Sequence, residues 1–173
     1  MTMPYTPVLA TLGYVFSPDR RQVLLIRRDA RLDDPHLGKY NGLGGKLESH
    51  EDIVTGMRRE IREEAGIECQ TLQLAGTVSW PGFGPNGQDW FGFIFRILEW
   101  SGTPLAANEE GSLSWIDLPD VLGLPLWEGD RQFLPIVFDL TAPPFHAVMP
   151  YAYGSPIGWT VHSLPVANSF PMQ

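Results

Sequence analysis

The chain has 173 residues, of which 43% are hydrophobic and 18% charged, and 20 acidic residues outnumber 12 lysines and arginines. This length predicts one domain with a sizeable core. A formal net charge of −8 disfavours long nucleic acid as a partner, because the chain lacks an excess of basic residues. One cysteine, Cys69, excludes an internal disulfide and a cysteine-built zinc site. With no basic leader and no apolar run of ~18 residues, we expect a cytoplasmic protein with no membrane partner.

The first fifty residues predict a β-hairpin followed by a loop. Val8–Phe16 and Gln22–Arg28 are β-prone and apolar, and Ser17-Pro18-Asp19 between them favours a turn. Arg31–Lys39 contains proline, glycine and two aspartates and is predicted to be a loop. The segment Leu43–Leu47, with two adjacent glycines, then leads into the clearest helix of the chain.

That helix is predicted to span Glu51–Ala65. Ser49, with an acid at Asp52 three residues later, is typical of an N-terminal capping box, and Gly66 suits a left-handed C-terminal cap. Apolar residues recur at every fourth position in the stripe Ile53, Met57 and Ile61. One face of the helix is therefore expected to pack against the core.

The rest of the chain predicts strands, loops and one further helix. We expect that helix at Asp130–Leu140, with Pro135 kinking it or lying in its first turns. The expected strands are Thr71–Trp80, Trp90–Leu98, Leu113–Ile116 and a final hairpin of Phe145–Tyr151 and Ile157–Leu164. Strands joined mostly by hairpins, with two helices and no linker, predict a single α/β (α+β) domain over residues 1–164 with a mixed sheet. Residues 165–173 are expected to form a flexible tail.

The first predicted helix carries a dense group of carboxylates. Glu60 and Glu64 lie four residues apart on one face, with Glu63 beside them. Like charges at this spacing repel each other by roughly 0.2–0.5 kcal/mol per pair, a cost that a bound cation would relieve. Hard oxygen ligands suit Mg²⁺ or Mn²⁺, although a charged helix face can also be merely solvated. Gly44 and Gly45 favour a metal site, because they let a backbone carbonyl approach a ligand closely.

The spacing of these residues matches a known motif. Gly45 is followed after five residues by Glu51, and after seven more by the run Arg59–Ile67, R-E-I-R-E-E-A-G-I. This pattern resembles the Nudix box, G-x5-E-x7-R-E-U-x-E-E-x-G-U, at all nine specified positions. The order of elements around it is also similar to the Nudix fold, a mixed sheet held between helices. The resemblance implies a hydrolase of nucleoside diphosphates linked to a further group X.

The resemblance also implies roles for the residues of the box. The implied ligands of Mg²⁺, or of Mn²⁺, are the Gly45 carbonyl, Glu60, Glu63 and Glu64. Glu63 could instead be the catalytic base that activates water. Glu51 and Arg59 would hold the loop and the glutamates in place.

Nudix proteins often take a further metal ligand or base from an acidic loop shortly before a strand tryptophan. Here Asn108-Glu109-Glu110 precedes Trp115, and we favour Glu110 over Glu109 for this catalytic role. A pair of solvated loop acids is the alternative.

Runs outside the box resemble the MutT-like branch that hydrolyses oxidised purine nucleoside triphosphates such as 8-oxo-dGTP. Tyr40–Lys46 resembles W-N-G-F-G-G-K, in which the asparagine binds the purine, so Asn41 is the first candidate for base recognition. Its alternative role is to form a turn before the glycines. Gly102–Leu105, G-T-P-L, resembles the G-T-P-V of the same branch.

A second run supplies further candidates for base recognition. Leu126–Pro135 resembles M-W-P-D-D-x-x-W-F-P, whose tryptophan stacks on the base and whose two aspartates read its edge. Trp127 and Asp130 correspond to the tryptophan and the second aspartate, although Trp127 could also be a packing anchor. Gly129 replaces the first aspartate, unless Glu128 takes that role after a small shift. This departure leaves the base preference open.

Strand residues provide the remaining candidates. Thr11 and Arg28 occupy positions at which the branch has a pocket threonine and a lysine, so we expect them to contact substrate. His146, in a run that resembles the F-H-G-Y of the branch, is expected to be structural. Strand aromatics that could form a pocket wall or simply core are Trp80, Trp90 and Phe93.

The leading functional hypothesis is a Mg²⁺-dependent nucleoside triphosphate diphosphohydrolase that releases a nucleoside monophosphate and pyrophosphate from an oxidised purine nucleotide. The alternative is a Nudix hydrolase of another compound, such as a dinucleoside polyphosphate, ADP-ribose or a capped RNA end. A Nudix-fold binding module without hydrolysis is disfavoured, because all three box glutamates are present. The expected partner is a small nucleotide, bound by a monomer or a dimer.

Overall fold

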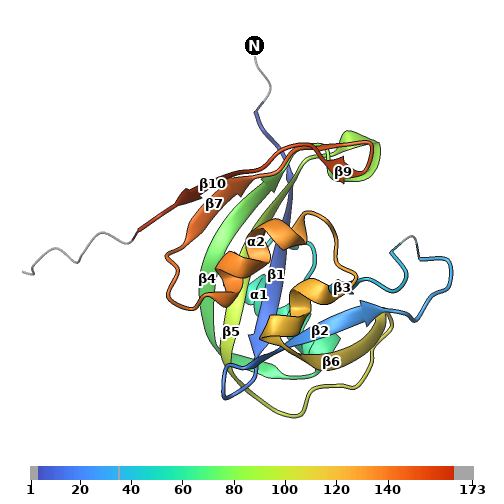
Figure 1. Cartoon of the computed structure of the whole chain (residues 1–173), viewed down its shortest axis with the longest axis vertical. Coiled ribbons are helices and arrows are strands. Elements are labelled where there is room, and N and C mark those ends of the chain that lie inside the picture. Colours follow the sequence, from blue (N-terminus) through green and yellow to red (C-terminus); the bar gives the residue numbers. More distant parts are fainter. Residues whose placement is uncertain (1–3, 35, 166–173) are drawn as a thin grey trace, which may run out of the picture.

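The computed structural model describes residues 4–34 and 36–165, and most of its strands form one mixed sheet (Figure 1). The strands of this sheet are β1 (Val8–Phe16), β2 (Gln22–Arg28), β3 (Tyr40–Asn41), β4 (Glu68–Trp80), β5 (Trp90–Ser101), β6 (Gly111–Asp117), β7 (Phe145–Val148) and β10 (Thr160–Ser163). Their order is β10-β7-β4-β5-β1-β2-β3, and β6 pairs with β2. The final hairpin carries a separate small ladder of β8 (Tyr151–Ala152) and β9 (Ser155–Pro156).

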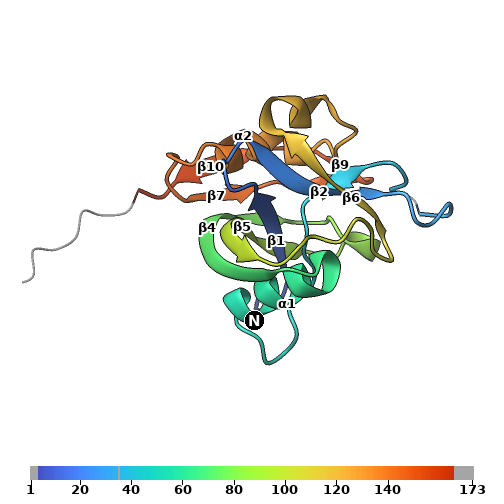
Figure 2. The ribbon, with the colours of Figure 1, turned by 90° about the horizontal axis from the view of Figure 1, so that it is seen from below.

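Two α-helices and two short 3₁₀ helices complete the fold. They are α1 (Ile53–Ala65), α2 (Asp130–Phe138), η1 (Pro85–Gly87) and η2 (Leu118–Gly123). Figure 2 shows α1 on one side of the strands β1, β4 and β5 and α2 on the other. This is the predicted architecture of a mixed sheet between helices.

The predicted N-terminal hairpin forms only close to its turn. β1 pairs antiparallel with β2 at two positions, and from Val8 to Val15 it pairs in parallel with β5 instead. β2 turns away to pair with β6 over its whole length. The divergence of β1 and β2 opens the sheet on the side where the glycine-rich segment Leu43–Leu47 lies.

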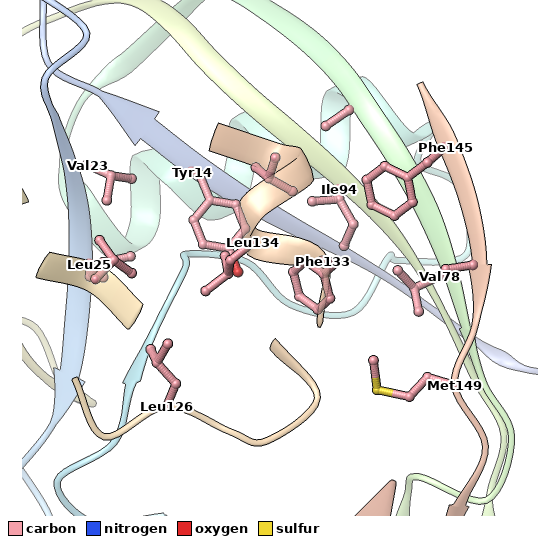
Figure 3. Packing of buried hydrophobic residues seen from close by; sticks show 14 of the residues in the cluster. Tyr14, Val23, Leu25, Val78, Ile94, Leu126, Phe133, Leu134, Phe145 and Met149 are labelled. Carbon is pink, nitrogen blue, oxygen red and sulfur yellow. The ribbon is translucent and has the colours of Figure 1, made fainter. Parts of the chain in front are cut away.

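Alternation along the strands produces two cores, one under each helix. On the α2 side the cluster includes Tyr14, Leu25, Ile94, Phe133 and Phe145 (Figure 3). Neighbouring strand residues point to the other face, where the stripe of α1 packs on them. The buried residues of that second core include Val15, Leu24, Met57, Ile61, Phe95 and Ile97.

The predicted ends of α1 need one correction. The N-cap is Asp52 and not Ser49, because the Asp52 carboxylate accepts hydrogen bonds from the Val54 and Thr55 backbone N–H groups at 2.8 and 3.0 Å. The helix therefore begins at Ile53, two residues later than expected. At the other end Gly66 is left-handed, with φ 69°, as predicted.

The second helix ends at Phe138 and not at Leu140, with Pro135 inside it. The guanidinium of Arg96, which is 1% exposed, donates to the backbone carbonyls of Ile136, Val137 and Asp139 at 2.7–2.8 Å. These carbonyls lie where a helix end lacks internal donors, so Arg96 supplies the C-terminal cap of α2.

Several strands extend beyond their predicted limits. β4 begins at Glu68 and β5 ends at Ser101, because the two form a long antiparallel ladder in which register shifts accommodate the extra residues. β6 likewise extends at both ends along β2. The final hairpin pairs β7 with β10 as predicted, but its distal part forms the β8–β9 ladder.

Three further observations concern single features. Cys69 is a buried thiol, and burial raises its pKa to about 11. No helix in the described part of the chain is long and apolar enough to cross a membrane. Of the predicted tail 165–173, residues 166–173 lie outside the described residues.

Candidate active site

The glycine-rich turn is held against β1. Gly13 and Leu43 exchange two backbone hydrogen bonds, at 2.6 and 2.9 Å, and the Thr11 N–H donates to the Gly45 carbonyl at 2.8 Å. Gly44 has φ 148°, and a Cβ there would collide with the Thr11 carbonyl. The turn therefore requires glycine at position 44.

The same turn lies directly against the carboxylates of α1. The Gly44 N–H donates to the Glu64 carboxylate at 3.0 Å. A Cβ at Gly45 would lie 2.6 Å from Glu60 Oε1, so the turn passes directly against that carboxylate. The Gly45 carbonyl, the predicted metal ligand, already accepts the Thr11 N–H, whereas the Gly44 carbonyl accepts no hydrogen bond from the described residues. A carbonyl oxygen has two lone pairs, so the Gly45 carbonyl remains a candidate metal ligand and the Gly44 carbonyl is a second candidate.

Arg59 organises the acidic end of the site. Its guanidinium binds both Glu51 oxygens, at 2.6 and 2.9 Å, and also donates to Glu60 at 2.8 Å and to Glu63 at 3.1 Å. A further bond to the Lys46 carbonyl, at 3.2 Å, ties it to the glycine-rich turn. The hydrogen bonds from Arg59 lower the pKa of Glu51 to about 2. Arg59 therefore positions the glutamates, and Glu51 anchors Arg59.

The two carboxyl groups at the centre of this cluster lie in surroundings that disfavour their charged forms. Burial, opposed by the hydrogen bond from Gly44 and reinforced by the charges of Glu110 and Glu60, raises the pKa of Glu64 to about 8. Burial also raises the pKa of Glu60. Glu63 differs from both, since its side chain is 59% exposed. A cation beside Glu60 and Glu64 would restore their charged forms.

The donor set fits a cation that arrives together with a phosphate ligand. Within the described residues, no three acidic, histidine or cysteine side chains converge closely enough to hold a metal ion between them. Mg²⁺, however, commonly takes only one or two carboxylates and completes its shell with waters and substrate phosphates. Glu60, Glu64 and the Gly44 or Gly45 carbonyl supply hard oxygens for such a partly built site.

Glu110 reaches this site from the loop before β6. The Asn108 side chain donates to the Glu64 carbonyl at 3.0 Å and accepts the Glu110 N–H at 2.8 Å, which ties the loop to α1. Arg28 binds the Glu110 carboxylate at 2.9 Å. The Glu110 charge is close enough to raise the pKa of Glu64. Two separate segments therefore bring their carboxylates to one place.

A pocket of about 380 Å³ extends from the glycine-rich turn towards the N-terminus of α2. Arg28, Gly44, Gly45 and Lys46 line the end beside the α1 carboxylates, and Asn41, Trp127, Asp130 and Tyr151 line the other. Two polar groups in its wall, the Thr11 hydroxyl and the Trp90 indole N–H, have no hydrogen-bond partner among the described residues. Unpartnered polar atoms of this kind favour a polar ligand.

Aromatic side chains and the carboxyl group of Asp130 form the end of the pocket near α2. The Trp127 ring packs against His36 with centroids 4.9 Å apart, and the Lys39 ammonium lies 5.4 Å from its centroid. Burial raises the pKa of Asp130 to about 7, against the opposing effect of Lys39 and Arg131. A carboxyl that is partly protonated at neutral pH can both donate and accept, as a purine edge requires.

A family model for the NUDIX domain matches residues 6–136. The chain belongs to the Nudix family. Oxidized purine nucleoside triphosphate hydrolase of Mus musculus is 34% identical over 133 residues, which cover 76% of this chain and 80% of that protein. The Danio rerio protein of the same name is 29% identical over 133 residues, with 77% and 81% covered.

A solved structure supports the same assignment. The mutator MutT protein from Bacillus halodurans superposes with a TM-score of 0.76 at 28% identity, covering 89% of this chain and 97% of the other. The chain is therefore a Nudix hydrolase with the mixed α+β fold of its relatives. Enzymes of this family generally use a divalent metal and act on small nucleotides.

Most of the residues that the sequence predicts for this site lie together in the structure. All five predicted substrate contacts line the one pocket: Thr11, Arg28, Asn41, Trp127 and Asp130. Trp80 and Trp90 line it as well. His146 lies outside the lining, where it bonds the Thr77 hydroxyl at 2.8 Å and stacks on Phe91, in keeping with a structural role.

Two alternatives that the sequence left open can now be decided. Phe93 packs with the α1-side core, because it points to the opposite face of β5 from Trp90 and Gly92. Glu128 is exposed and does not line the pocket, so it does not replace the missing aspartate. At Gly129 a Cβ would collide with the Tyr151 hydroxyl. Tyr151 therefore occupies the space of the missing side chain.

The lining residues that sequence reasoning missed come from loops and from the final hairpin. They are His36, Lys46, Phe83 and Tyr151, with Ala10, Leu12 and Gly92 on the strands. The sequence contained one clue to Tyr151: Gly129 stands where the related enzymes have an aspartate, so another side chain can occupy that space. No local pattern marks a loop residue that reaches the pocket only through packing.

Proposed function

We propose that this Nudix hydrolase is a Mg²⁺-dependent nucleoside triphosphate diphosphohydrolase that converts an oxidised purine nucleotide, such as 8-oxo-dGTP, into the monophosphate and pyrophosphate. The observation that carries the proposal is the polarity of the pocket. Glycine backbone, Arg28 and Lys46 form one end, directly beside the carboxylates of α1, while a tryptophan, an amide and a protonatable carboxyl form the other. The two relatives named as oxidized purine nucleoside triphosphate hydrolases support the same substrate class.

At the phosphate end, Glu60, Glu64 and the Gly44 or Gly45 carbonyl would hold the metal. When bound, Mg²⁺ neutralises phosphate charge, polarises phosphorus and acidifies a coordinated water. Arg28 offers a guanidinium to a phosphate oxygen from the pocket wall. We assign the removal of a proton from water to Glu110, because its charge acts directly on Glu64, at which the metal would lie.

At the base end, Trp127 would stack on the purine, and Asn41 and Asp130 would bind its edge. An oxidised purine such as 8-oxoguanine carries a donor at N7 where guanine has an acceptor. Asp130 can accept from this donor in its charged form and donate in its neutral form. The Tyr151 hydroxyl, which lies against Gly129, supplies a further polar group at this end.

The first test is a comparison of nucleotides with Mg²⁺ present, with products separated by chromatography. We expect 8-oxo-dGTP or 2-hydroxy-dATP to be hydrolysed with a kcat/KM at least about tenfold above that of dGTP and dATP. Monophosphate and pyrophosphate should be the products. Preferential turnover of ADP-ribose, with none of 8-oxo-dGTP, would overturn the proposal.

The second test removes the metal ligand while keeping the shape of its side chain. Glu64→Gln should lower kcat at least about 100-fold on every nucleotide, because the amide cannot bind Mg²⁺ as a carboxylate does. The variant should fold normally, since burial already favours a neutral group at this position. Glu68→Gln, an exposed substitution just beyond the helix, is the matched control. Full activity of Glu64→Gln would refute the assigned metal site.

A second groove supports another Nudix substrate as an alternative. It has a volume of about 580 Å³ and shares His36, Phe83, Trp90, Trp127 and Tyr151 with the first pocket. Such a groove could take the second half of a dinucleoside polyphosphate. The nucleotide comparison distinguishes the two, because a dinucleoside substrate would release two nucleotides and no pyrophosphate.

A further inference from the structure

Asp34 connects the two ends of the pocket without lining it. Its side chain is 7% exposed although it lies in the loop between β2 and β3. One carboxylate oxygen accepts the Arg28 Nε–H at 2.7 Å, and the other accepts the His36 backbone N–H at 2.8 Å. The hydrogen bonds from His36 and Arg28 lower the pKa of Asp34 and keep it charged. Each oxygen therefore serves a different part of the site.

The first oxygen orients Arg28. With Nε on Asp34, the guanidinium directs Nη1 to the Glu110 carboxylate at 2.9 Å. Its Nη2 makes no hydrogen bond within the described residues, and Arg28 lines the pocket. An arginine fixed by a buried carboxylate holds its planar fork in one orientation. Asp34 thus determines where Arg28 can hold Glu110 and which nitrogen faces the pocket.

The second oxygen supports the base end. The bond to the His36 N–H closes a local turn, and the His36 ring then packs on Trp127. Burial lowers the pKa of His36, so the ring packs as a neutral imidazole at pH 7. Because the His36 backbone is held, its ring is kept against Trp127 in the pocket wall.

Resting on the proposed function, we propose that Asp34 is a positioning residue for both ends of the pocket: it acts on Glu110 through Arg28, and on Trp127 through the backbone of His36. The two actions use different oxygens and can be separated by substitution. In Asp34→Asn the amide oxygen can still accept the His36 N–H, but the amide nitrogen cannot accept from Arg28. In Asp34→Ala both bonds are lost.

The test is steady-state kinetics with the nucleotide that the wild-type enzyme turns over fastest. Asp34→Asn should lower kcat about tenfold and leave KM within about twofold, because only the orientation of Arg28 and Glu110 is disturbed. Asp34→Ala should lower kcat similarly and also raise KM several-fold. Asp33→Asn, at the neighbouring exposed position, is the matched control and should behave as the wild type.

A double substitution with Glu110→Gln tests whether Asp34 affects kcat through Glu110. If Asp34 acts on kcat through Glu110, adding Asp34→Asn to Glu110→Gln should lower kcat no further. A full additional loss, or kinetics of Asp34→Asn equal to those of Asp33→Asn, would overturn the proposal. Thermal melts of each variant separate these effects from loss of the fold.

Failure of the proposed function is distinguishable from failure of this inference. If the wild-type chain hydrolyses no nucleotide, the proposed function is wrong, and the role of Asp34 is then measured by calorimetric titration with a purine nucleoside monophosphate. Asp34→Ala should weaken binding several-fold while Asp34→Asn should not. Equal affinities of the wild type and Asp34→Ala would overturn the positioning role.

Discussion

Two carboxyl groups at opposite ends of the pocket have raised pKa values for the same reason. Burial raises the pKa of Glu64 to about 8 and that of Asp130 to about 7. Their neighbours differ, since Glu64 faces other acids and Asp130 faces Lys39 and Arg131. A divalent cation suits the first environment, and a neutral donor and acceptor such as a purine edge suits the second.

Asp130 should make stability depend on pH. Its folded pKa of about 7 lies above the ordinary value of 3.8, so its stabilising contribution is complete below about pH 4 and is lost as the pH rises through 7. Relative to Asp130→Asn, the wild type should therefore lose up to about 1 kcal/mol of unfolding free energy per pH unit over this window. Urea denaturation at pH 4.5, 6 and 7.5 measures the difference.

The control for this titration is Asp120→Asn, an exposed aspartate of η2. It should follow the wild-type pH dependence throughout. Parallel pH profiles of the wild type and Asp130→Asn would contradict the raised pKa of Asp130.

At the scale of elements, each helix was predicted correctly at one end, α1 at its C-terminus and α2 at its N-terminus. The stripe, the C-terminal glycine and the box glutamates of α1 all follow from spacing within one segment. The end of α2 depends on Arg96, which comes from β5 and caps the helix from across the sheet. Such a cap has no local signature, so the sequence pattern extended α2 two residues too far.

Arg96 should therefore stabilise α2 and, through it, the base end of the pocket. Arg96→Met removes three hydrogen bonds to carbonyls of a largely buried helix end and should cost about 3 kcal/mol of unfolding free energy. Because Asp130 begins the same helix, we also expect a several-fold rise in KM. Denaturation curves and nucleotide kinetics on the same preparation measure both effects.

Arg58→Met, an exposed arginine of α1, is the matched control and should change stability by less than about 0.5 kcal/mol. An Arg96→Met variant as stable as this control would show that α2 needs no cap from β5.

For the whole molecule, the candidate active site accounts for only a small part of the acidic net charge. The box, residues 45–67, contains six of the acids and four of the bases, so its net charge is −2 out of −8. The uneven distribution matters more than the sum, because Glu60, Glu64 and Glu110 come from two segments and are close enough for their charges to interact. The remaining acidity is spread over loops and still disfavours long nucleic acid.

Mg²⁺ should consequently stabilise the whole fold. At about ten times its Kd, the ion should add about 1.4 kcal/mol of unfolding free energy and raise Tm by roughly 3–6 °C. NaCl at equal ionic strength should not reproduce this shift, and Glu64→Gln should reduce it strongly. Thermal denaturation followed by circular dichroism provides the measurement, and an equal shift with NaCl would exclude a specific site.

The sequence by itself determined the family, the carboxylate-rich helix and the glycine turn before it. These features depend on short spacings: residues four apart share a helix face whatever the rest of the chain does, and adjacent glycines permit a close approach in any fold. Asn41, Trp127 and Asp130 were predicted because they lie in contiguous runs that resemble a known branch.

Only the tertiary structure decided which groups complete the pocket. Tyr151 fills the space beside Gly129 because the final hairpin packs against the start of α2. Asp34 reaches Arg28 because the loop after β2 returns to that residue, where the Arg28 N–H donates to the Lys39 carbonyl. Such contacts join residues that no local period relates, and packing of the whole chain is what brings them within hydrogen-bonding distance.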